Sequence, residues 1–132
     1  MKLRDLIECN KSLSSLKDKH LPVSLGFAIS RNFKKLVPIM EDYEDKKMML
    51  LRKYAKKDEE GQIYTNKLGQ AMIPSSAEVE FNKEMDELVS SETEIVFDKV
   101  PNDTLTRCEE DARYDIPTSE ELGFIDDYML EK

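Results

Sequence analysis

The chain has 132 residues, of which 39% are hydrophobic and 36% charged, and its net charge is −8. This length suits a single domain, and the regular spacing of the apolar residues argues against disorder. No apolar run approaches the roughly 18 residues that a membrane span needs, and charges interrupt the N-terminal segment MKLRDLIECNKSL, where a signal peptide would be apolar. Two cysteines, Cys9 and Cys108, are too few for a disulfide scaffold or a four-ligand zinc site. We therefore expect a cytoplasmic protein without membrane segment, metal or cofactor.

The charges are distributed unevenly along the chain. Residues 1–57 hold 14 Lys and Arg against 7 Asp and Glu, whereas residues 58–132 hold 6 against 21. The two halves could fold together and interleave their charges on one solvated surface. Alternatively, an acidic face survives folding and meets a basic partner such as a nucleic-acid-binding protein, because complementary charge speeds encounter and disfavours wrong partners.

Two amphipathic helices are predicted in the basic half. Apolar residues at helical spacing predict a first helix over residues 2–17. Pro22 suits the first turn of a second, long helix, whose apolar series runs to Tyr54 and needs a partner helix to cover it. Pro38 lies inside this helix, so we expect a bend near residues 34–38.

A β-hairpin, a third helix and a strand are predicted next. The similar units DEEG-QIYT and NKLG-QAMI each combine a turn with a short apolar segment, which favours a hairpin between residues 62–65 and 70–73. Ser75 and Glu78 have the spacing of a capping box, which predicts a helix to about Ser90 as the partner of the long helix. The β-branched and aromatic residues of 93–100 predict a strand.

The C-terminal segment is acidic and carries apolar anchors. A short helix is expected around Leu105 and Cys108, and a capping box of Thr118 and Glu121 predicts a last helix. This helix could dock on the core of its own chain, or it could be a tethered motif that inserts its anchors into another protein. For the second case the candidate partner-binding residues are Glu109, Glu110, Asp111, Glu120, Glu121, Phe124, Asp126, Asp127 and Tyr128.

Catalytic motifs are not found in the sequence. The single histidine, His20, has no Ser or Cys placed beside it as a nucleophile, and the spacing before Gly61 and Gly69 does not fit a calcium-binding loop. The basic residues of the long helix are interleaved with acidic ones and accompanied by no recognition motif. We therefore expect neither an enzyme nor direct binding to nucleic acid.

Residues 1–100 resemble a group of small uncharacterised proteins encoded in phages and prophages of low-GC Gram-positive bacteria. The similarity is carried by KHLPVSLGFAISRNFKKL, by LLRKYAKKDEEGQ at the end of the long helix, and by FNKEMDELVSSETEIVFDKV. The resemblance implies a phage origin and a helix-hairpin-helix-strand layout, and it implies no reaction.

These patterns together predict an α+β fold that is mainly α, with a long helical hairpin, a small β-hairpin or sheet and an acidic C-terminal helix. We expect a domain over residues 1–100 and an acidic extension over 101–132. The expected function is that of a non-enzymatic, phage-encoded protein that binds a host or phage protein in the infected cell and inhibits or modulates a host or defence protein. The alternatives are a virion accessory or assembly protein and a homo-oligomeric structural module that uses the long helix.

Overall fold

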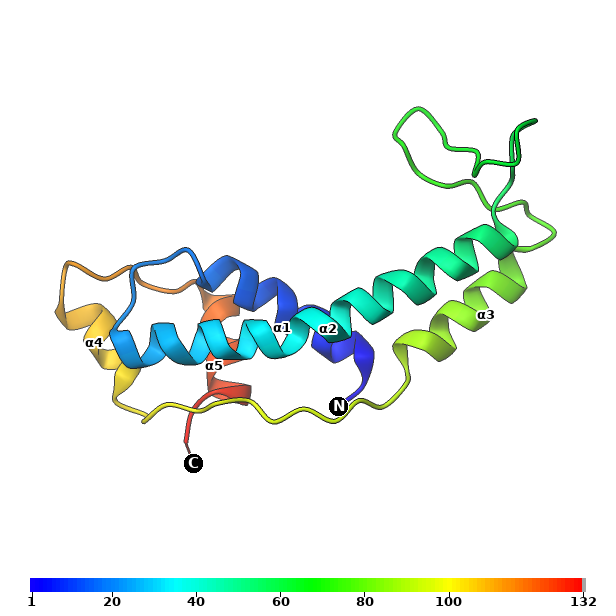
Figure 1. The fold of residues 1–132 in the computed structure, drawn as a ribbon. Helices are drawn as coiled ribbons and strands as arrows, with labels where there is room; N and C mark the ends of the chain where they lie inside the picture. The colour runs from blue at the N-terminus through cyan, green and yellow to red at the C-terminus, as the bar shows by residue number, and fades with distance from the viewer. Residues whose placement is uncertain (132) are drawn as a thin grey trace.

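The computed structural model describes residues 1–131 and contains five helices. They are α1 (Leu3–Leu16), α2 (Val23–Tyr54), α3 (Glu78–Val89), α4 (Thr104–Glu110) and α5 (Ser119–Tyr128). In Figure 1, α1, α4, α5 and the first half of α2 form a body, from which the second half of α2 projects beside α3 as an arm. All five predicted helices are therefore present, and we use "arm" below for residues 38–54 of α2 together with α3.

The core lies in the body. Leucines at helical spacing on α1, among them Leu6, Leu13 and Leu16, are fully buried. They share one apolar cluster with Leu25, Ala28, Ile29, Leu36, Phe97, Val100, Phe124, Ile125 and Met129. Because α1, α2, α5 and the segment around Phe97 all contribute to this cluster, α5 is docked on the core of its own chain.

The long helix continues through Pro38, as its apolar period predicted. Proline cannot donate the backbone hydrogen bond to the preceding turn and its ring crowds that turn, which bends a helix. Figure 1 shows the axis of α2 changing direction near the middle of the helix, which agrees with the bend expected near residues 34–38. The bend directs the second half of α2 away from the body.

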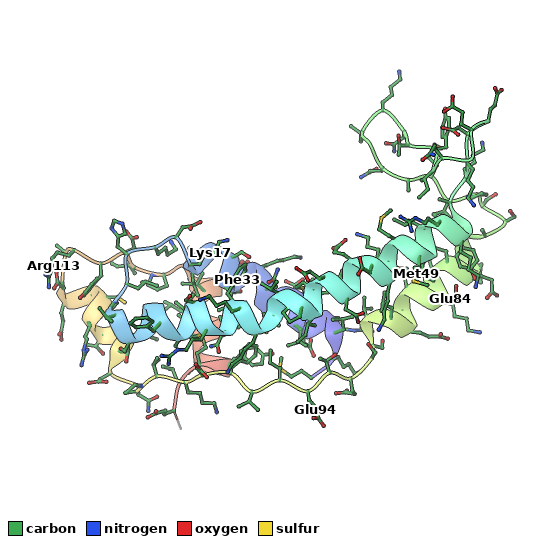
Figure 2. All side chains as sticks on the ribbon, viewed as in Figure 1. Lys17, Phe33, Met49, Glu84, Glu94 and Arg113 are labelled. Carbon is green, nitrogen blue, oxygen red and sulfur yellow. The ribbon has the colours of Figure 1, made fainter. Side chains whose placement is uncertain are left out.

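The arm has little core of its own. No residue of α3 is buried, and α2 has no buried residue beyond Leu36. The two helices meet through the edge-to-face rings of Tyr54 and Phe81, 6.1 Å apart, and through an ion pair of 3.3 Å between Lys53 and Glu84. Two helices alone can cover only one side of each other, so the apolar side chains of the arm remain half-buried or, as at Met49 (Figure 2) and Val79, 66% and 76% exposed.

The expectation of an α+β fold with a sheet is wrong. Helices hold 57% of the chain and strand or bridge positions only 6%, and within residues 1–131 the β-pairing is confined to isolated bridges. At the predicted hairpin a single bridge, Thr65 to Ala71, pairs 62–65 with 70–73, and another joins Lys57 to Ile63, but neither extends into a strand ladder. The protein is therefore helical.

The two similar sequence units instead form two similar turns. The Asp58 carboxylate accepts hydrogen bonds from the backbone N–H groups of Glu60 and Gln62, both at 2.9 Å, and Asn66 accepts in the same way from Leu68 and Gln70. Gly61 and Gly69 close the turns with φ of 81° and 76°, a conformation that residues with a Cβ rarely adopt. Local side chains thus bind backbone groups that a hairpin ladder would have needed.

The strand predicted over residues 93–100 is also absent. The segment lies extended beside α2 (Figure 1), where the Asn32 side-chain amide donates to the Asp98 carbonyl at 3.0 Å and accepts from the Asp98 N–H at 2.7 Å. Lys35 donates to the Val96 carbonyl at 2.7 Å. Side chains of a helix therefore take the place of a neighbouring strand.

One of the two predicted capping boxes is present. The Thr118 side chain accepts from the Glu121 N–H at 3.3 Å, and the Glu121 carboxylate accepts from the Thr118 N–H at 2.7 Å, so the box at α5 is confirmed. The box predicted from Ser75 is wrong, because α3 begins after Ala77 and has no side-chain cap.

Candidate functional site

A groove with acidic walls lies between α1 and α5, and we call it the acidic groove. It has a volume of about 310 Å³ and is lined by Asp5, Glu8, Cys9, Ser12, Glu120, Phe124 and Tyr128. Positions 5, 8, 9 and 12 share one face of α1, and positions 120, 124 and 128 follow one another at four-residue spacing on α5. The helical periods of the two elements therefore bring these side chains together.

The floor of the acidic groove is apolar and its rim is charged. Phe124 and Cys9 are buried, whereas Asp5, Glu8 and Glu120 are exposed. Phe124 is held between aromatic neighbours, with ring centroids 5.5 Å from Tyr128 and 6.2 Å from Phe97. Three rim carboxylates thus surround a rigid aromatic floor.

The groups in the acidic groove that could act as nucleophiles are held protonated. Burial, together with the nearby Asp5 carboxylate, raises the pKa of the Cys9 thiol to about 12. Burial also raises the pKa of Tyr128, with added repulsion from neighbouring negative groups that include Asp5 and Asp127. The groove therefore offers a neutral thiol, a phenol that can donate a hydrogen bond, and carboxylates.

The structure separates the nine residues predicted to bind a partner. Glu120, Phe124 and Tyr128 line the acidic groove, although Phe124 is a core residue whose ring is only 6% exposed. Four others are exposed carboxylates elsewhere on the body: Glu109 and Glu110 on α4, and Asp126 and Asp127 on α5. In Figure 1, α4 lies at the end of the body opposite the arm, so Glu109 and Glu110 do not form one continuous site with the groove.

The two remaining predicted residues are engaged within the chain. The Arg113 guanidinium, 2.7 Å from Asp111, lowers the pKa of that carboxyl to about 2. Glu121 is 3% exposed and accepts a hydrogen bond of 2.6 Å from Ser15, with Lys19 at 3.5 Å. Burial alone would raise the pKa of Glu121, but these partners and the capping contacts to Thr118 outweigh it and lower the pKa. Glu121 therefore joins α5 to α1, whereas Asp111 makes a local contact with a residue two positions away.

The sequence did not indicate Asp5 and Glu8 as site residues. They are three positions apart, so the sequence could have predicted that both lie on one face of the first helix. The sequence could not predict that α5 lies beside that face.

Within residues 1–131, no cluster of three or more His, Cys, Asp or Glu side chains has the arrangement needed to hold a metal ion.

Comparison with known proteins found no relative: the chain matches no protein family, no curated protein and no solved structure. Among the helices of residues 1–131, none combines the length and the apolar character needed to cross a membrane.

Proposed function

We propose that this protein is a non-enzymatic protein-binding module that takes up a basic segment of a partner protein in the acidic groove. The observation that carries the proposal is the combination of three exposed rim carboxylates, Asp5, Glu8 and Glu120, with a buried aromatic floor. Rim charges steer a partner and select it, and apolar contacts with the partly exposed ring of Tyr128 retain it.

The expected partner carries Lys or Arg beside an apolar anchor. Glu8 forms an ion pair of 3.0 Å with Lys11, whereas no ion pair is found for Asp5 or Glu120 within residues 1–131, so the groove keeps an excess of negative charge. Surfaces that bind phosphate groups are rich in Lys and Arg, and a nucleic-acid-binding protein therefore has the chemistry that the acidic groove recognises. Occupation of such a surface would inhibit or modulate that protein.

The resemblance to small phage proteins supplies the setting for this proposal. A phage-encoded protein acts in the infected bacterial cell, so the partner is sought among host proteins and host defence proteins. A role in the virion, as an accessory or assembly protein, remains the alternative, and the presence of the protein in purified particles would favour it.

The proposal is tested by affinity capture from a bacterial lysate with three forms of the protein. The groove variant combines Asp5→Asn, Glu8→Gln and Glu120→Gln, and the matched control combines Asp103→Asn, Glu109→Gln and Glu110→Gln at exposed positions in and before α4. Both variants remove three negative charges, so a difference between them reports the location of the site and not the net charge.

We expect the wild type and the control to retain the same basic protein and the groove variant to lose it. Binding should weaken as salt rises, because exposed charges carry part of the recognition. Equal retention by all three forms would contradict the proposal, and loss in the control alone would move the site to α4.

A further inference from the structure

The size of the acidic groove limits what can enter it. Its volume of about 310 Å³ lies at the lower end of the range of roughly 300 to 1,000 Å³ that ligand pockets span. The two helices that form its walls are held close together, because Ser15 of α1 donates a hydrogen bond of 2.6 Å to Glu121 of α5. The groove therefore has room for one long side chain of a partner and not for a helix.

The rim of the acidic groove offers hydrogen-bond acceptors that the chain itself leaves largely unused. Asp5 and Glu120 take part in no ion pair within residues 1–131, and Glu8 has one exposed partner, Lys11, on the same helix. Exposed pairs of this kind contribute little to stability, so a ligand can replace Lys11. A ligand that satisfies carboxylates on both α1 and α5 needs several N–H donors that point in different directions.

The ring of Tyr128 is the aromatic surface that a ligand in the groove can contact. It is partly exposed, whereas Phe124, the other aromatic residue of the groove, is only 6% exposed. Phe97 and Phe124 hold the Tyr128 ring in place, with ring centroids 5.8 Å and 5.5 Å from it. The face of an aromatic ring attracts cations, and a planar cation can stack on it.

We propose, on the basis of the proposed function, that the acidic groove takes up one arginine side chain of the partner in preference to a lysine. The guanidinium group donates to Glu120 on one wall and to Asp5 or Glu8 on the other, and its plane lies against the ring of Tyr128. The groove thus reads the shape of the cation as well as its charge.

Lysine suits the same groove less well for two reasons. Its ammonium group is a compact charge with three donors, whereas the planar fork of arginine has five and can reach carboxylates on both walls. An ammonium group is also more strongly hydrated, so its contact with the Tyr128 ring costs more. We expect arginine to bind about twofold to fivefold more tightly, which corresponds to one exposed cation–π contact.

Three small probes, added to the full chain, test this preference. They are the N-acetyl methylamides of arginine, lysine and citrulline, of which citrulline has nearly the shape of arginine without its charge. In an NMR titration the arginine probe should shift the backbone amide signals of Glu8, Ser12, Glu120 and Tyr128 and bind more tightly than the lysine probe. The citrulline probe should cause no saturable shift. The shifts should be lost in the groove variant described above and persist in its charge-matched control.

Substitutions of Tyr128 test the stacking contact separately from the charges. Tyr128→Phe keeps the ring and should keep the preference, whereas Tyr128→Leu should lower the affinity of the arginine probe to that of the lysine probe. Thermal unfolding checks that both variants are folded. Equal affinities of the two probes for the wild type, or a preference that survives in folded Tyr128→Leu, would overturn this inference and leave the proposed function standing. No shift at the groove with either probe would count against the proposed function as well.

Discussion

Asn32 shows how a single polar side chain determines the path of a segment. It is fully buried on α2, and its amide satisfies both the N–H and the carbonyl of Asp98, 66 positions away. We expect Asn32→Ala to destabilise the protein by about 1 to 3 kcal/mol, because it leaves the part-buried N–H and carbonyl of Asp98 without their partner. Urea unfolding measures this loss, and Asn102→Ala at an exposed position should change the free energy of unfolding by less than about 0.5 kcal/mol. Equal effects of the two substitutions would contradict this role.

Glu121 makes stability depend on pH in a defined direction. Its pKa is lower in the folded chain than in the unfolded chain, so its stabilising contribution is complete above the unfolded pKa and is lost as the pH falls through the folded pKa. Glu121→Gln keeps the shape but removes the charge that Ser15 and Lys19 contact. The wild type should therefore be more stable than this variant at neutral pH, and the difference should shrink as the solution is acidified. Thermal unfolding of both proteins across the acidic range measures it, and a difference that does not change with pH would contradict the assignment.

At the scale of the helices, the body and the arm differ in how completely they bury their side chains. Leu13 of α1 is fully buried, whereas Leu50 of α2 is only partly covered by α3. We expect Leu13→Ala to cost about 2 to 5 kcal/mol, as for a fully buried leucine, and Leu50→Ala to cost roughly 1 kcal/mol. Chemical denaturation of both variants gives the comparison. A larger loss at Leu50 than at Leu13 would show that the arm, and not the body, holds the main core.

The elements that could be predicted from the sequence are those that depend on neighbouring residues. The leucine period of α1, the continuous period of α2 and the Thr118 capping box lie within a few turns of chain, and all three are present. The absence of a strand over residues 93–100 could not be predicted from local sequence, because the backbone of this segment binds Asn32 from a distant part of the chain. Likewise, the acidic groove depends on α1 lying beside α5, a contact that joins Ser15 to Glu121 across 106 positions.

At the scale of the whole molecule, the segment after Pro101 belongs to the packing of the body. Phe124, Ile125 and Met129 are buried in the same cluster as the leucines of α1. We expect a chain truncated after Pro101 to lose cooperative thermal unfolding, because truncation exposes the apolar face of α1 to water. The control deletion replaces residues 58–70, which form the two turns between α2 and α3, with a short glycine linker. It should leave the body folded, because these residues contribute nothing to the core cluster. A truncated chain that unfolds like the full protein would contradict this account.

We propose that the acidic groove binds a basic protein partner, and the most direct test is the affinity of the captured partner for the groove variant and for its charge-matched control. We expect the groove variant Asp5→Asn, Glu8→Gln, Glu120→Gln to bind about tenfold or more weakly, because the rim charges face the partner. The control at Asp103, Glu109 and Glu110 should stay within about twofold of the wild type. Titration calorimetry at low and at higher salt should show the loss in the groove variant alone, together with a weaker dependence on salt. Equal affinity of the two variants would contradict the claim.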